Sequence, residues 1–491
     1  MINKNIFKIT FLFLILAEIL SFFGWLLPSF NVVCFCVILI LTLIFSLVKL
    51  EYGIYILLAE LFIGSKGYLF SLEFNETLIS IRIGLFLIIF SVWFVNFLKT
   101  KNKKEYFNFK FNKNYLWLGI VILWSFVWGI IRGNNFGNVF LDFNNWLYFL
   151  LILPFFSVAK NNDNFLKNIL TILIASVLWI GIKSLILLYI FSHEFIWALP
   201  EVYKWVRDTG VGEVTFAGGG FWRVFIQSQV YSLLTFFIIF PFFNLHNYLI
   251  SNKISSFKLK IKKNNLLNPY FLILTACLTT ILLSFSRSYW VALIFTLLIY
   301  YFVILFLKIK FLDFLKINVK IIIITIISFA IVFLVINLPP KIDGGNLASM
   351  LGKRATEMEA SSSSRINQLK PLLREIAKHP VIGSGFGTTV TYFSNDPRIV
   401  PETAGQTGEF TTYSFEWGYL DLILKFGVVG FCIYLFLIFK ILRKLFDLRF
   451  GFFLALISLL IVNIFSPYLN HPLGIGFLIL ASVVVENKNL S

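Results

Sequence analysis

The sequence is poor in charge. Only 13% of its 491 residues are charged, whereas 59% are hydrophobic, and the mean hydropathy is +0.87. A soluble core cannot absorb that much apolar surface, but a bilayer-spanning helix requires about 20 apolar residues. The shortage of charge therefore excludes an ordinary soluble domain and predicts a chain that crosses a membrane many times.

The sequence also lacks regular alternation of polar and apolar residues. Strands of a transmembrane β-barrel alternate over about 10 residues, but here Phe, Ile and Leu occur in long unbroken runs. Only helices remain as spanning elements, because lipid offers no partner to an unpaired backbone group. The first run, residues 6–27, has no small-residue cleavage site and is followed at once by further runs, so we assign it as the first helix.

Cysteine is scarce, and internal repeats are missing. All four cysteines lie inside apolar runs, and Cys34 and Cys36 are too close in sequence to share a helix face. Neither a disulfide framework nor a metal site is predicted. No repeat of fixed period is visible, and the only low-complexity tract is Ser361–Ser364.

What the sequence does contain is a series of fourteen apolar runs, which predicts an all-α polytopic membrane protein with about 12–14 transmembrane helices. The expected helices cover residues 8–25, 32–48, 52–70, 78–98, 115–131, 140–158, 165–191, 224–245, 270–284, 289–307, 321–338, 419–439, 450–465 and 473–485. We divide the chain into N-terminal helices (1–191), central helices (192–338), a large polar loop (339–415) and C-terminal helices (416–491).

The basic residues predict the orientation of these helices. They gather in alternate connections, among them residues 99–113, 253–263, 308–320 and 440–449, whereas the connections of opposite parity hold few, chiefly Lys66, Arg82, Arg132 and Arg287. Because Lys and Arg concentrate in cytoplasmic connections, both termini are expected in the cytoplasm. The net charge of +18 then reflects topology and not nucleic-acid binding. Residues 192–222, 284–288 and 338–415 are expected outside.

The large outer loop is the longest polar interval in the chain and the place where chemistry in water is most expected. Within it, Ser364–Lys378 has apolar residues at helical spacing, which predicts an amphipathic helix that lies on the membrane surface or packs on the bundle, and we favour packing. His379 precedes a proline, where a helix ends, so a capping role is favoured over a catalytic one. Gly383, Gly385 and Gly387 follow a helix and not a strand, so we exclude a nucleotide-binding loop.

Two arginines stand at expected helix mouths on the outer side, where basic residues are otherwise rare. Arg223 follows three glycines, Gly218–Gly220, and Arg287 lies among Ser284, Ser286 and Ser288. One interpretation is that they only extend to the lipid headgroups. The other is anion binding, because a guanidinium fork matches a phosphate.

Acidic residues offer two further candidates. Glu416 either favours the start of the helix that follows it or acts as a general base at the water boundary. Asp421 and Lys425 are spaced as a self-satisfied i,i+4 pair. Four ionisable residues lie inside the apolar runs and should face the bundle interior: Glu18, Glu60, Asp142 and Lys183. Of these, Asp142 lies near enough to the outer side to pair with an arginine.

Four motifs resemble the O-antigen ligase and polymerase superfamily (WaaL and Wzy type): FWRVFIQSQ, SFSRSYWVAL, SRINQLKPLLREIAKHPVIGSGFGT and YLDLILKFGVVGF, within residues 221–439. The resemblance implies a membrane glycosyltransferase of the GT-C type. Such enzymes transfer a glycan from a polyprenyl diphosphate such as undecaprenyl diphosphate, on the outer face of the cytoplasmic membrane, to an acceptor hydroxyl. The acceptor is lipid A core in a ligase or the next carrier-linked repeat in a polymerase. No nucleotide sugar, metal or other cofactor is implied.

The resemblance also implies roles for residues. Arg223 and Arg287 would hold the diphosphate. Family members often carry a His-Asn pair where this chain has Glu416 and Trp417, so Glu416 would take the place of the family's supposed base. Arg365 and His379 would organise the loop over the cleft, and we expect a chain-length regulator or a flippase as a protein partner. A flippase or other transporter is the rival function, although the internal repeats common in that class are not seen; a sensor without catalysis would not explain the outer arginines.

Overall fold

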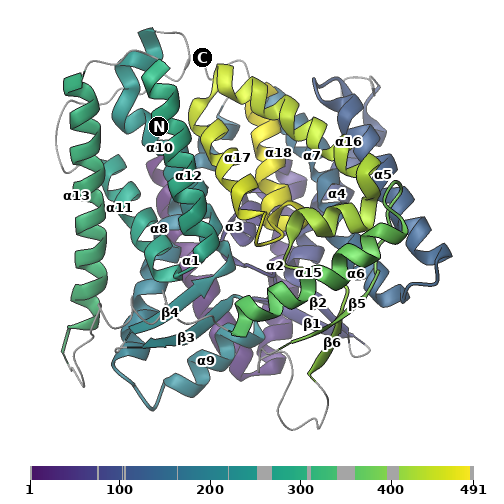
Figure 1. Cartoon of the computed structure of the whole chain (residues 1–491), viewed down its shortest axis with the longest axis horizontal. Coiled ribbons are helices and arrows are strands. Elements are labelled where there is room, and N and C mark those ends of the chain that lie inside the picture. The colour runs from purple at the N-terminus through teal and green to yellow at the C-terminus, as the bar shows by residue number, and fades with distance from the viewer. Residues whose placement is uncertain are drawn as a thin grey trace.

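The chain folds into a helical bundle (Figure 1). The computed structural model describes residues 3–74, 77–101, 103, 107–162, 164–218, 221–251, 268–306, 311–339, 360–394 and 408–486. Over these residues, nine helical segments are long and apolar enough to cross a membrane, and three shorter helices are also apolar. The prediction of an all-α polytopic membrane protein is therefore confirmed. The basic segments at 253–263 and at Lys308 and Lys310, as well as Gly219 and Gly220, lie outside the described residues.

The N-terminal half of the chain builds one side of the bundle. Its elements are α1 (Lys4–Leu26), α2 (Pro28–Val48), α3 (Leu50–Ile63), β1 (Ser71–Phe74), β2 (Thr77–Ser80), α4 (Ile81–Lys99), α5 (Asn112–Ile131), α6 (Phe136–Leu147), η2 (Tyr148–Leu151), α7 (Ile152–Asn161), α8 (Phe165–Ser192), α9 (Leu199–Asp208), β3 (Gly212–Gly218), β4 (Phe221–Ile226) and η3 (Gln227–Gln229). The core helix is α8, whose apolar residues are mostly buried.

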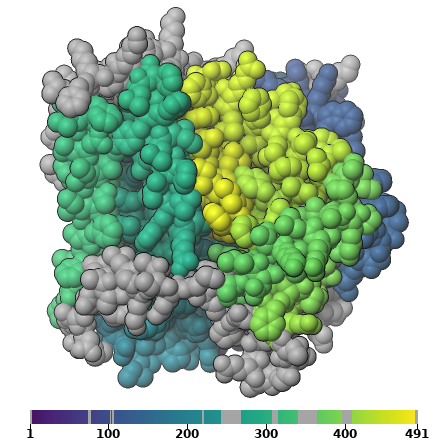
Figure 2. All heavy atoms as spheres, viewed as in Figure 1, coloured from purple at the N-terminus to yellow at the C-terminus, as the bar shows by residue number. Residues whose placement is uncertain are grey.

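The C-terminal half completes the bundle. It comprises α10 (Val230–Ser251), α11 (Pro269–Ser284), α12 (Arg287–Phe306), α13 (Phe311–Ile336), α15 (Ala360–Lys378), β5 (Val390–Phe393), β6 (Glu409–Thr412), α16 (Gly418–Leu448), α17 (Phe450–Val462), η5 (Tyr468–Asn470) and α18 (Pro472–Glu486). In the space-filling view, the green atoms of α15 lie at the lower right of the face shown, beside the yellow C-terminal helices (Figure 2).

Three antiparallel hairpins, β1–β2, β3–β4 and β5–β6, gather with α9 and α15 at the lower end of the bundle in Figure 1, whereas both termini lie in the upper half of the view. We call this lower end the hairpin end. The amphipathic helix expected at Ser364–Lys378 is present as α15, and it packs on the bundle: Leu372 is buried against Phe415 and Leu424. The favoured interpretation of that segment is confirmed.

The expectation of a helix from residue 224 was wrong at its start. Residues 221–226 form β4, which pairs with β3 in the register Val214↔Val224 and Thr215↔Arg223, and the helix begins only at Val230. The segment FWRVFI is rich in aromatic and β-branched residues, which favour a strand once a partner strand is available. Similarly, α3 ends at Ile63 and not near residue 70, and residues 77–80, expected to begin a helix at 78, form β2.

The glycine loop after α15 wedges between α5 and α16. Gly383, Gly385 and Gly387 all have positive φ, and their α-carbons face backbone atoms of α16, α5 and α6 respectively at distances that leave no room for a Cβ. The backbone nitrogen of Ser384 donates to the Leu424 carbonyl at 2.6 Å, next to Gly427, whose φ of 66° breaks α16. Glycine is required here for close backbone approach.

Buried ion pairs connect the helices. The Lys425 ammonium lies 2.7 Å from an Asp142 oxygen and 2.8 Å from an Asp421 oxygen, and the other Asp142 oxygen accepts from the Gly387 nitrogen at 2.9 Å. Two further buried pairs are Arg82–Glu60 and Lys183–Glu18. Asp142, for which the sequence suggested an arginine, is thus paired with a lysine, and Lys425 is shared by two carboxylates.

Candidate active site

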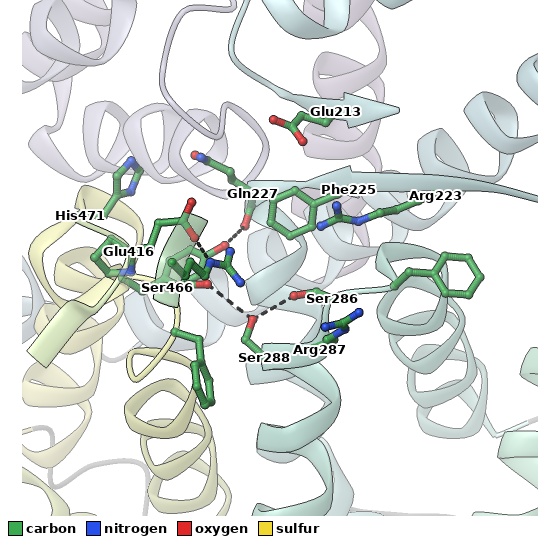
Figure 3. Close-up of a pocket in the computed structure, with 15 residues that line it drawn as sticks. Glu213, Arg223, Phe225, Gln227, Ser286, Arg287, Ser288, Glu416, Ser466 and His471 are labelled. Carbon is green, nitrogen blue, oxygen red and sulfur yellow. Dashed lines mark hydrogen bonds and ion pairs between the residues drawn. The ribbon is translucent and has the colours of Figure 1, made fainter. Parts of the chain in front are cut away.

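The described residues enclose a pocket of about 290 Å³ at the hairpin end. Segments far apart in the sequence line it: the β3–β4 hairpin, the α11–α12 turn, α15, the start of α16 and the turn between α17 and α18 (Figure 3). The lining residues are mostly polar and comprise Glu213, Arg223, Phe225, Gln227, Phe285, Ser286, Arg287, Ser288, Arg365, Glu416, Phe465, Ser466, Pro467, Tyr468 and His471.

Arg223 is placed by the β3–β4 hairpin. Its Nε donates to the Ser284 carbonyl at 3.0 Å, and its guanidinium carbon lies 4.9 Å from the centre of the Phe225 ring. The hydrogen bond uses one of the five N–H donors of the side chain. It ties the arginine to the α11–α12 turn, so that Arg223 and Arg287 line the same side of the pocket (Figure 3).

Arg287 stands at the first position of α12, directly after a tight turn. Phe285 adopts a left-handed conformation with φ of 44°, which ends α11 and lets the chain reverse within two residues. The hydroxyls of Ser286 and Ser288 lie 2.9 Å apart and face the pocket. A helix N-terminus with an arginine and two hydroxyls is suited to an anion, because the helix dipole and the donors point the same way.

Glu416 lies just before α16 and forms an ion pair with Arg365 of α15. The indole nitrogen of Trp417 donates to the Arg365 carbonyl at 2.9 Å, which fixes α15 against the start of α16. The Glu416 side chain remains 45% exposed, so its carboxylate is open to a ligand in the pocket. The ion pair with Arg365 fixes the position of this carboxylate at the edge of the pocket.

The turn between α17 and α18, residues 463–471, provides the wall that the sequence analysis missed. The hydroxyls of Tyr289 and Tyr468 lie 2.5 Å apart, and both donate to the Gln227 carbonyl. Tyr434 donates to the Leu469 carbonyl at 2.8 Å, and Asn470 is hydrogen-bonded to Asp421. The run SPYLNHP is a polar interruption between two apolar runs, and this was the one sequence signal that pointed to it.

Within this turn, His471 is held neutral. Its Nδ1 accepts from the Leu473 backbone nitrogen at 3.3 Å, so the neutral ring carries its proton on Nε2. Burial, together with the positive charges of Arg82 and Lys66, lowers the pKa of His471 to about 3. Burial also raises the pKa of the neighbouring Tyr468 hydroxyl, which therefore remains protonated.

Of the five predicted site residues, Arg223, Arg287, Arg365 and Glu416 all line this pocket. His379 does not: it ends α15, where its carbonyl accepts from the Gly383 nitrogen at 3.0 Å. In the described part of the chain, no three His, Cys, Asp or Glu side chains gather as a possible metal-binding group.

Residues 271–435 match the family model described as O-antigen ligase (Wzy_C). The matched stretch contains Arg287, Arg365 and Glu416, whereas Arg223 and the turn 463–471 lie outside it. No curated protein matches the chain. The match confirms the resemblance to the O-antigen ligase and polymerase superfamily, and it supports a membrane glycan ligase or polymerase in general.

Proposed function

We propose that the protein is a GT-C-type membrane glycosyltransferase that polymerises or ligates a glycan carried on a polyprenyl diphosphate. The observation that carries the proposal is the meeting of Arg223, Arg287, Arg365 and Glu416 in one pocket, although they come from four separate segments. The family match at residues 271–435 supports the same class of reaction.

In this proposal, Arg223 and Arg287 bind the diphosphate of the donor, assisted by the Ser286 and Ser288 hydroxyls. The oxygen of an acceptor hydroxyl attacks the anomeric carbon of the donor sugar, and the bond from that carbon to the phosphate oxygen breaks on the opposite side. Negative charge then grows on the leaving diphosphate, where preorganised donors stabilise it most. The acceptor proton passes to the Glu416 carboxylate, and the configuration at the anomeric carbon inverts.

Arg365 and His379 have supporting roles in the proposal. Arg365 pairs with Glu416 and lines the pocket, so it orients the carboxylate and adds a positive charge near the donor. His379, at the end of α15, orders the loop through its backbone bond to Gly383. The diphosphate is itself an activated leaving group, so the proposed reaction requires no nucleotide and no metal.

We further propose that the protein is a multi-pass protein of the cytoplasmic membrane, with the hairpin end outside and both termini in the cytoplasm. The distribution of Lys and Arg among the connections supports this orientation. The substrates would then be a lipid-linked oligosaccharide and a glycan or lipid acceptor, both at the outer surface of the bilayer, with a chain-length regulator or flippase as protein partner.

The test is an assay of the purified protein in nanodiscs with a short polyprenyl-diphosphate-linked oligosaccharide, without nucleotide and with EDTA. Released polyprenyl diphosphate together with a lengthened glycan supports a polymerase, and transfer only after a distinct acceptor is added supports a ligase. If the carrier crosses the bilayer intact and no glycan is transferred, the protein is a transporter and the proposal fails.

A further inference from the structure

The pocket has two chemically different walls. Arg223 and Arg287 form the cationic wall, and His471 lies with Glu416 across from them (Figure 3). The wall around His471 also contains the Arg365–Glu416 ion pair and two polar, uncharged side chains, Ser466 and Tyr468. A diphosphate requires the first wall, whereas uncharged donors and acceptors match the hydroxyl groups of a sugar.

The His471 ring presents a defined donor. The Leu473 nitrogen occupies Nδ1, which leaves the proton on Nε2 as the donor of the neutral ring. The chain is fixed on both sides of His471, because Asn470 is bonded to Asp421 and the Leu473 carbonyl accepts from Tyr231 at 2.7 Å. A rigidly placed donor selects its ligand more strongly than a mobile one.

Gln227 supplies the complementary acceptor. Among the described residues, its side-chain oxygen Oε1 is buried and has no hydrogen-bond partner, although the residue lines the pocket. A buried acceptor without a partner is costly unless a ligand or water satisfies it. A sugar hydroxyl, which both donates and accepts, satisfies such an acceptor and can receive a hydrogen bond from His471.

We propose that His471, together with Gln227, forms the binding subsite for the acceptor sugar, with the Nε2 proton of His471 donated to a hydroxyl of that sugar. The inference rests on the proposed function, and it adds the place of the acceptor: the wall made by the α17–α18 turn, on the side of Glu416. His471 binds and orients the acceptor in this scheme and does not exchange a proton with it.

The experiment uses the full-length protein in nanodiscs and two separable substrates. The donor is the lipid-linked oligosaccharide extracted from the source organism, and the acceptor is the same oligosaccharide with a fluorescent group in place of its diphosphate, so that it can accept but not donate. Acceptor binding is measured by fluorescence polarisation without donor, and transfer is measured with each substrate varied in turn.

The expected result for His471→Ala is an acceptor Kd and an acceptor KM that are each about five- to tenfold higher, with the donor KM unchanged, because one neutral hydrogen bond is lost. His471→Gln keeps an N–H donor and should recover both values to within about twofold. His193→Ala is the matched control, since that ring bonds to the Leu338 carbonyl and does not line the pocket.

Three outcomes overturn the inference: an unchanged acceptor Kd in His471→Ala, an equal rise in donor KM, or a wild-type protein that does not bind the acceptor. The proposed function fails separately, when the wild-type protein transfers no glycan at all. A misfolded His471→Ala variant is recognised by its elution profile, and the His471→Gln variant then decides the question.

Discussion

The backbone nitrogen of Gly427 lies 2.5 Å from the place where a Cβ on Gly383 would stand. The break in α16 at Gly427 therefore packs directly against the loop at Gly383. A side chain on either glycine would collide with the backbone of the other segment. Because α16 begins two residues after Glu416, this contact helps to set where the carboxylate stands.

A methyl group at Gly383 should therefore destabilise the protein strongly. Gly383→Ala adds a backbone collision to a φ of +77°, and we expect a loss of at least about 2–3 kcal/mol, seen as a lower melting temperature in detergent. Gly133→Ala is the matched control, because Gly133 has the same φ of +77° with nothing within 4 Å of its Cβ position. Equal losses in the two variants would contradict the packing argument.

Arg287→Ala should reduce glycan transfer by about 10²- to 10³-fold, because a preorganised donor to the leaving diphosphate is lost. Arg223→Ala should have the same effect, and lysine at either position should restore only part of the activity, since it lacks the bidentate fork. Transfer is measured with the nanodisc assay. Arg374→Ala on the exposed side of α15 should retain activity, and full activity in both pocket variants would disprove the assigned roles.

Glu416→Gln should lower kcat and leave the donor KM unchanged, because an amide cannot take up the acceptor proton. Glu416→His tests whether Glu416 replaces the family histidine. That variant should retain activity that rises with pH through about 6.5, where a histidine becomes neutral and able to accept a proton. An inactive histidine variant that is correctly folded would show that the two side chains are not interchangeable here.

Lys425→Met should destabilise the protein by about 3–5 kcal/mol, because Asp142 and Asp421 are then buried without a counter-charge. Neutralising both carboxylates in the same protein, with Asp142→Asn and Asp421→Asn, should return much of the lost melting temperature. Lys378→Met is the control: its pair with Glu375 is at the surface, with the lysine side chain 62% exposed, and should contribute little.

His471 should make the protein less stable in mild acid. The pKa of His471 in the native protein is about 3, below the ordinary value of 6.5, because the ring is buried and experiences the charges of Arg82 and Lys66. Between these two pH values the unfolded chain binds a proton at this histidine, whereas the native protein does not. The contribution of neutral His471 to the free energy of unfolding is fully present above pH 6.5 and decreases as the pH drops toward 3. Melting temperatures at pH 7.5 and 5 should therefore fall further in the wild type than in His471→Gln, and parallel losses would contradict the low pKa.

The helices could be predicted from the sequence because their signal is local. A run such as residues 165–191 is predominantly apolar, and α8 matches its bounds within one residue. The β3–β4 hairpin could not be predicted in the same way, because residues 221–226 are mostly apolar as well and look like the start of a helix. Their pairing with residues 212–218 depends on contacts between strands, which local hydrophobicity does not reveal.

The candidate site was predicted in part for a related reason. Arg223, Arg287 and Glu416 stand out because charge is rare in this chain, and motif order links them. His471 lies outside the quoted motifs, and Gln227, although it is part of FWRVFIQSQ, is uncharged and is not distinguished within that motif. Only the fold, which packs the α17–α18 turn against η3, brings them to the arginines.

The partial exposure of Glu416 makes the pocket chemically addressable. A cysteine introduced at this position would line the pocket, whereas the native Cys34 and Cys277 are buried and the exposed Cys36 and Cys432 are first replaced by serine. Membrane-impermeant thiol reagents would then report from which side of the membrane the pocket opens, and protection by a bound lipid-linked sugar would report its occupancy. The same exposure thus offers a handle for covalent probes of the pocket.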